Sequence, residues 1–292
     1  MKQIAILPAE PWEAERERVE SLASRLTGYD IIFIDWYGQT ESAGITLPNL
    51  RIETPRSARV FRRRRRMRFA EKAASRADVI LTTGPYPEDR VALYGKPLLF
   101  LPEGVDFEAF HGASERNLPF PGDLFTVKNP IIGHSGPVDE GLNLSYVRAA
   151  AEAHPEWAFV FVGPVRTGVS AWQAYPNIHL LGEKPPHHLP AYISRFDVCI
   201  NIAGSDAASP KGLYAYLAAG KPIVSAPHPA QALDYTEVAY LAGTPEEFIT
   251  CCKKAIGERD AWKVRRRVEY GRAASWDARA AELERMIKEL SL

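Results

Sequence analysis

The chain has 292 residues, enough for about two average domains. Hydrophobic residues make up 46% and charged residues 25%, a balance typical of a globular protein with a buried core. Lys and Arg together number 36, as do Asp and Glu, so the net charge favours neither nucleic acid nor a membrane as partner. No apolar run approaches the ~18 residues of a membrane span, and three cysteines exclude a disulfide framework. We therefore expect a cytoplasmic, two-domain protein.

Strand and helix patterns alternate in the first part of the chain. Uninterrupted apolar runs predict strands that are covered on both faces at 3–7, 31–34, 77–81 and 97–101. Apolar residues at helical spacing predict helices at 13–26, 57–77 and 89–94, the second of them strongly basic. The stretch 36–55 has no clear period and is rich in Gly, Thr, Ser and Pro, so we predict a loop there.

The pattern changes between Gly104 and Asn129, where prolines and a non-periodic run of phenylalanines predict a linker. Alternation then resumes. Strands are predicted at 130–133, 158–162, 178–181, 198–200 and 222–224. Helices are predicted at 143–153, 189–195, 211–219, 245–256 and 260–290, the last one broken near Gly271.

Alternating short strands and longer helices predict an α/β fold, because parallel strands need crossover connections. Two such blocks on either side of a linker predict two Rossmann-like domains facing a cleft. We place the N-terminal domain at 1–115, the C-terminal domain at 116–275, and a closing helix at 276–292 that packs back toward the first domain.

Several common catalytic motifs are missing from the sequence. It has no GxxxxGK[ST] phosphate loop, no GxGxxG after the first strand of either block, and no HExxH or paired CxxC for zinc. The segment 133–137 (GHSGP) resembles the GxSxG elbow of hydrolases, but Pro137 stands where the second glycine is needed. These absences argue against nucleotide hydrolysis by a phosphate loop, dinucleotide binding and zinc chemistry.

The segment 205–222 combines a small-residue loop with the start of a helix. Ser209 is a suitable N-cap, and Pro210 suits the first turn. Such a helix start presents free backbone N–H groups to an anion, and Lys211 adds a positive charge there. The alternative is an ordinary capped helix with no ligand.

The segment 209–225 resembles the donor-site helix of family 4-type glycosyltransferases of the GT-B fold (glycosyl transferases group 1). Other segments match the family in order and spacing at 101–110, 130–136, 161–164, 176–182, 189–198 and 275–279. The resemblance covers roughly Ala77 to the C-terminus. It implies two Rossmann-like domains in a GT-B-like arrangement, with an N-terminal, acceptor-side domain that is shorter than is usual in the family.

The resemblance also implies a function. A glycosyltransferase of this kind moves a sugar from a nucleotide-diphosphate donor to an acceptor, here unidentified, without a metal or other cofactor, and cell-envelope polysaccharide synthesis is the expected setting. The residues that match the family's nucleotide-sugar site are Ser135, Gly136, Gly163, Pro164, Glu183, Lys184, Pro185, Ser209, Pro210, Lys211, Gly212 and Leu213.

Two positions depart from the family pattern. Ala215 and Ala207 stand where the family usually has donor-site glutamates, and Asp206 is the nearby carboxylate, so we take Asp206 as the candidate catalytic residue. These departures keep a second hypothesis open, in which the protein is a catalytically degenerate, GT-B-like binding or scaffold protein.

The predicted basic helix contains five consecutive arginines, Arg62, Arg63, Arg64, Arg65 and Arg66. One interpretation is a solvated face, paired in part with the glutamates of the first helix. Another is a surface for anionic lipid headgroups, which would suit a lipid-linked acceptor and a peripheral position at the inner face of the membrane. Nucleic acid or an acidic partner is a weaker alternative. A partner chain that completes the shortened acceptor site is also open.

Overall fold

The structure is a computed structural model. It describes residues 1–8, 12–34, 47–53, 72, 74–83, 95–113, 118–139, 141–166, 172, 175–202, 211–227 and 235–290, with the backbone alone for Glu13, Ala14 and Lys211. The chain divides into two compact units, one made of 1–104 and 276–292 and the other of 105–275.

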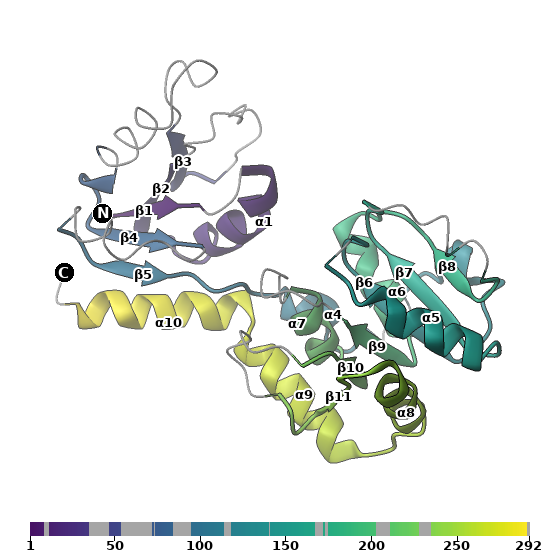
Figure 1. The fold of residues 1–292 in the computed structure, drawn as a ribbon. Coiled ribbons are helices and arrows are strands. Elements are labelled where there is room, and N and C mark those ends of the chain that lie inside the picture. Colours follow the sequence, from purple (N-terminus) through teal and green to yellow (C-terminus); the bar gives the residue numbers. More distant parts are fainter. Residues whose placement is uncertain are drawn as a thin grey trace. The chain divides into compact units, whose positions relative to one another are not determined.

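The first unit contains a five-stranded sheet in the order β3-β2-β1-β4-β5, in which each pairing is parallel (Figure 1). Its strands are β1 (Lys2–Leu7), β2 (Tyr29–Ile34), β3 (Leu50–Glu53), β4 (Val79–Thr82) and β5 (Leu98–Phe100). Its helices are α1 (Trp12–Ala23) and, from the far end of the sequence, α10 (Trp276–Glu289).

The central strands of this sheet are buried on both faces, as their uninterrupted apolar runs predict. Alternate residues of β1 belong to different cores. Ile4 and Ile6 pack with residues of α1 and α10, whereas Ala5 and Leu7 pack on the other face with Ala74 and with isoleucines of β2 and β4. Helix α10 therefore supplies part of the core of the first unit.

The second unit contains a six-stranded parallel sheet in the order β11-β10-β9-β6-β7-β8 (Figure 1). Its strands are β6 (Ile131–Ser135), β7 (Ala158–Val162), β8 (Ile178–Leu180), β9 (Val198–Asn201), β10 (Ile223–Ser225) and β11 (Ala239–Leu241). Its helical segments are α4 (Phe107–Phe110), η3 (Gly122–Leu124), α5 (Leu144–Ala153), η5 (Pro186–His188), α6 (Leu189–Arg195), α7 (Lys211–Ala218), α8 (Pro245–Ile256) and α9 (Ala261–Ala273).

Helices α6 and α7 cover one face of the second sheet, and α5 and α8 cover the other. The start of α8 shows why a helix begins at this point. The Thr244 side chain accepts a hydrogen bond from the Glu247 N–H, and Glu247 Oε2 accepts one from the Gly243 N–H 2.7 Å away. These two contacts give partners to the Glu247 and Gly243 N–H groups. Pro245, in the first turn, has no N–H that would need a partner.

The structure corrects the sequence predictions in three places. Residues 50–53, predicted as loop, form the edge strand β3, and β11 lies where no strand was predicted. Both are short edge strands with a single sheet neighbour, so they lack the long apolar run of a central strand. Gly271 lies inside α9, and the helical end is interrupted after Ala273 instead.

Other predictions fall outside the described residues, among them most of the helix predicted at 57–77, all of the one predicted at 89–94, and Arg62–Arg66. Two glutamates that could have paired with the basic helix have partners on α1 itself, since Glu15 pairs with Arg18 and Glu20 with Arg16. Within the described ranges, no helix has both the length and the apolar content required to cross a membrane.

Candidate functional site

The order of strands in the second sheet marks where a ligand would bind. Starting from β6, the chain builds β7 and β8 on one side of that strand and β9, β10 and β11 on the other. In such sheets, ligands bind beyond the carboxyl ends of the strands at the point where the winding direction changes. Here that point lies between β6, which ends at Ser135, and β9, which ends at Asn201.

Three glycines follow the carboxyl ends of β6, β7 and β8 and bring the backbone of these turns close together. The Gly136 N–H donates to the Val162 carbonyl, and the Gly163 N–H donates to the Gly182 carbonyl, each over 2.9 Å. A Cβ on Gly163 would lie 2.0 Å from the Gly136 carbonyl oxygen, and both residues have φ near +150°. A side chain at position 163 would therefore clash with the backbone, and only glycine fits both the conformation and the space.

Helix α7 begins against the end of β6. A Cβ on Gly212 would lie 2.8 Å from the Ser135 carbonyl oxygen, so the first turn of α7 and the end of β6 are in contact. One turn further along α7, the Tyr216 hydroxyl accepts a hydrogen bond from the Ser135 N–H over 2.6 Å. Burial strongly raises the pKa of Tyr216, which keeps the hydroxyl protonated. Tyr216 was not predicted as a site residue, because a tyrosine in a run of apolar helix residues is typical of a side chain that packs in the core.

The first turn of α7 thus lies at the carboxyl edge of the sheet, next to the end of β6. Backbone N–H groups at a helix start carry partial positive charge and favour an anion. The preceding segment, with Asp206, Ala207, Ser209 and Pro210, lies outside the described residues, as does the Lys211 side chain. Their predicted contacts with a diphosphate remain predictions.

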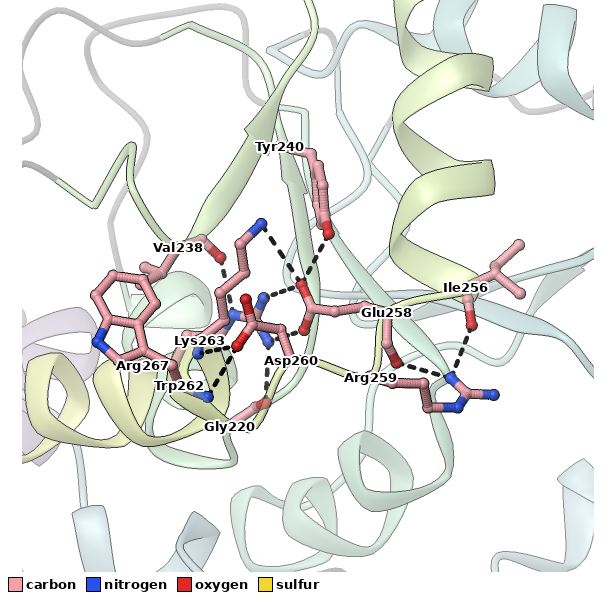
Figure 2. Close-up of polar contacts among 10 residues, drawn as sticks. All are labelled: Gly220, Val238, Tyr240, Ile256, Glu258, Arg259, Asp260, Trp262, Lys263 and Arg267. Carbon is pink, nitrogen blue, oxygen red and sulfur yellow. Dashed lines mark hydrogen bonds and ion pairs between the residues drawn. The ribbon is translucent and has the colours of Figure 1, made fainter.

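The other end of α7 is fixed by α9. A Cβ on Gly271 would lie 2.4 Å from the Ala218 backbone nitrogen, so the two helices touch through their backbones. Figure 2 shows the polar contacts beside this packing. Arg267 is fully buried and makes two hydrogen bonds of 2.6 Å to the Glu258 carboxylate, and it also donates to the Val238 and Gly220 carbonyls. Because Gly220 lies two residues beyond the end of α7, this network fixes the turn that follows that helix.

The loop after β8 contains three of the predicted site residues, Glu183, Lys184 and Pro185. The Lys184 ammonium lies 2.8 Å from the Asp123 carboxylate, and the Tyr192 hydroxyl also donates to Asp123. The hydrogen bond to Asp123 raises the pKa of Lys184, against the effect of burial. Burial tends to raise the pKa of Asp123, but Lys184 and Tyr192 outweigh it and the pKa is lowered. Asp123 lies in the predicted linker and was not identified from the sequence.

The remaining predicted residues have distinct surroundings. The Leu213 side chain is buried in the core, so its backbone alone is available to a ligand. The Pro164 carbonyl accepts a hydrogen bond from the Val138 N–H over 2.9 Å. Ala215 is also in the core, with 5% of its surface exposed. The described part of the chain has no cluster of three or more His, Cys, Asp or Glu that could hold a metal ion.

No protein-family model matches the chain. A relative by sequence is the "Putative teichuronic acid biosynthesis glycosyltransferase TuaH" of Bacillus subtilis (strain 168), which is 28% identical over 233 residues. The aligned part covers 74% of this chain and 58% of the relative, so the chain spans little more than half of that protein.

Two solved structures share the architecture of the chain at low sequence identity. HepE of Anabaena, crystallised in complex with UDP and glucose, has a TM-score of 0.65 at 14% identity over 99% of both chains. A UDP-forming α,α-trehalose-phosphate synthase of Burkholderia xenovorans also has a TM-score of 0.65, at 10% identity over 100% of both chains. With its two parallel α/β sheets, the chain has the GT-B glycosyltransferase fold. The fold that the sequence resemblance implies is thereby confirmed.

Proposed function

We propose that the protein is a glycosyltransferase that moves a sugar from a nucleotide-diphosphate donor to an acceptor. The observation that carries the proposal is the contact between the first turn of α7 and the end of β6, at the position where the winding of the sheet changes direction. The carboxyl edge of the sheet at that position, with a helix start beside it, suits the diphosphate of a nucleotide sugar.

The chemistry follows from the charge that develops as the sugar leaves. The bond between the sugar carbon and the diphosphate oxygen breaks, an acceptor atom bonds to that carbon and loses its proton to solvent, and the nucleoside diphosphate departs with added negative charge. Backbone N–H groups in the first turn of α7 are fixed before the reaction and would stabilise that charge without reorganising. The proposal includes no metal, because the helix start and Lys211 would offset the charge instead.

The relatives support a choice of donor and setting. TuaH bears the name of a teichuronic acid biosynthesis glycosyltransferase, and HepE was crystallised with UDP and glucose. We infer that a UDP-sugar is the first donor to test, and that the product belongs to the cell envelope.

Calorimetric titration with UDP-glucose, and then with GDP- and ADP-sugars, tests the proposal. We expect the wild-type chain to bind at least one of them, and Gly212→Ala to weaken that binding by about tenfold, because its Cβ would press on the Ser135 carbonyl. Gly257→Ala is the matched control, since the nearest atom to its Cβ is 3.6 Å away. The absence of binding by every nucleotide sugar at millimolar concentration would refute the proposed function.

A non-catalytic binding protein is the second candidate, and Ala215 favours it. The resemblance places a donor-site glutamate at this position, but here a small apolar residue packs in the core of the second unit. An assay for free UDP released from UDP-glucose separates the two candidates. Slow release supports the enzyme, whereas tight binding without release over hours supports the binding protein.

A further inference from the structure

Asp123, Lys184 and Tyr192 form a three-residue contact next to the candidate site. The Lys184 Nζ lies 2.8 Å from Asp123 Oδ2 and 5.8 Å from the centre of the Tyr192 ring. The Tyr192 hydroxyl lies 2.9 and 3.0 Å from the two Asp123 carboxylate oxygens. The three side chains come from η3, the loop after β8, and α6, so the contact ties that loop to two helical segments.

The loop that this contact holds, residues 182–186, has backbone polar groups that are available to a ligand. It starts at Gly182, whose φ of +71° favours glycine, and it continues into Pro185 and Pro186, which fix their own φ angles. As far as the structure describes the chain, the backbone N–H and carbonyl groups of Glu183 and Lys184 make no hydrogen bond. The loop therefore presents two donors and two acceptors on a restrained backbone, at the carboxyl edge of the sheet.

We propose that Asp123 is a positioning residue for nucleotide binding, acting through Lys184. Its carboxylate holds the Lys184 ammonium, which fixes the open backbone of residues 183–184 in place to pair with the edge of a nucleobase. The same ion pair keeps the ammonium from serving as a phosphate ligand. The inference rests on the proposed function, because it assigns this loop to the base of the nucleotide donor.

The chain offers a matched control with the same chemistry in the same unit. Glu237 accepts hydrogen bonds from Arg266 Nε and from the Tyr270 hydroxyl, each over 2.7 Å. Its carboxylate thus also contacts a cation and a tyrosine hydroxyl. Glu237 lies just before β11 and contacts α9, and it does not contact the loop after β8 in the described structure. Glu237→Gln should therefore leave nucleotide binding unchanged.

The test compares two ligands that share a diphosphate, of which UDP alone carries a base and a ribose. Calorimetry measures UDP and inorganic pyrophosphate binding to the wild-type chain, Asp123→Asn, Tyr192→Phe and Glu237→Gln. We expect Asp123→Asn to weaken UDP binding by about tenfold, since it removes a charged partner of Lys184. Tyr192→Phe leaves the ion pair in place and should weaken UDP binding by about threefold. Pyrophosphate binding should be unchanged, or stronger where the ammonium is released.

A rescue experiment separates positioning from general damage. Asp123→Glu keeps the charge and should retain most of the UDP affinity, and the charge-swapped pair Asp123→Lys with Lys184→Asp should recover part of it. Equal losses for UDP and pyrophosphate would overturn the inference, as would unchanged UDP binding in Asp123→Asn. If the wild-type chain binds no nucleotide, the proposed function fails and the inference fails with it, which is a different result from binding that Asp123→Asn leaves intact.

Discussion

Each unit of the molecule contains an arginine in an ion cluster, fully buried for Arg267 and 15% exposed for Arg18, and the two clusters differ in their balance of charge. Among the described residues of the second unit, Arg267 pairs with one carboxylate, Glu258, which also accepts a hydrogen bond from the Tyr240 hydroxyl and lies 3.9 Å from Lys263 Nζ (Figure 2). In the first unit, Arg18 faces two carboxylates, Glu15 and Glu103. Among the described residues, one cluster thus places two cations, Arg267 and the more distant Lys263, around one carboxylate, and the other places two carboxylates around one cation.

The two arginines also differ in how many of their N–H groups have a hydrogen-bond partner. Arg267 places its N–H groups on Glu258 and on two backbone carbonyls, and the described residues leave none of its nitrogen atoms without a partner. Arg18 donates to the Thr83 carbonyl, but among the described residues its Nε has no hydrogen-bond partner. We therefore expect the Arg267 network to lose much stability when one member of its ion pair is removed, and the Arg18 cluster to tolerate better the loss of one of its two carboxylates.

The largest effect is expected in the completed network. Arg267→Met leaves the Glu258 carboxylate, 4% exposed, without its main partner, and should lower the free energy of unfolding by about 3–5 kcal/mol. Denaturant unfolding of the full chain measures the loss. The double variant Arg267→Met with Glu258→Leu removes both charges and should recover much of it. A loss below about 1 kcal/mol in the single variant would contradict the assignment of a tightly coupled pair.

A smaller effect is expected in the cluster with two carboxylates. Glu103→Gln leaves Arg18 paired with Glu15, so the free energy of unfolding should fall by about 1 kcal/mol. The matched variant in the second unit, Glu258→Gln, removes the carboxylate that accepts two hydrogen bonds from Arg267, and it should lower the free energy of unfolding several times as much. Equal losses for the two glutamine variants in the same denaturant experiment would erase the contrast between the clusters.

The smallest effect is expected from pH, and it concerns one residue of the second unit. Burial lowers the pKa of His134 below its ordinary value of 6.5, although the Ile200 and Pro137 carbonyls and Asp139 act in the opposite direction. The folded state therefore favours the neutral ring. The resulting stability is complete above pH 6.5 and is lost progressively as the pH falls from 6.5 toward the folded pKa. His134→Gln should flatten this slope in unfolding experiments between pH 7.5 and 5, and an unchanged slope would rule out His134 as its source.

Much of the fold follows from local pattern. The run Ala158–Val162 and the helix Leu189–Arg195 were predicted with the bounds that the structure shows. The apolar pattern of a central strand, or of a helix with one buried face, indicates which of its residues are buried. The edge strand Leu50–Glu53 was missed because it is short and carries two charged residues. Gly271 was misjudged as a helix break, since only the packed structure shows that α7 needs the space.

The candidate site was less predictable than the fold. Gly136, Gly163 and Gly212 were identified from motifs, and the structure places them at the carboxyl edge of one sheet. Tyr216 and Asp123 were missed because each acts on a partner distant in sequence, separated by 81 residues from Ser135 and by 61 from Lys184. Neither residue belongs to a sequence motif that indicates its partner, so the sequence pattern alone could not predict these two contacts.

The strand-like contact between Val105 and Ser275 has a consequence for how the chain can be cut. The Val105 N–H donates to the Ala274 carbonyl over 3.0 Å, so the second unit begins and ends at neighbouring points. The second unit is a continuous insertion in the sequence of the first unit. In an excised segment 105–275, the two ends would already lie next to each other, held by this hydrogen bond. A chain truncated after Ser275 would instead strip Leu283 and Ile287 from the hydrophobic interior of the other unit, so removing the tail harms the part of the protein encoded at the opposite end of the sequence.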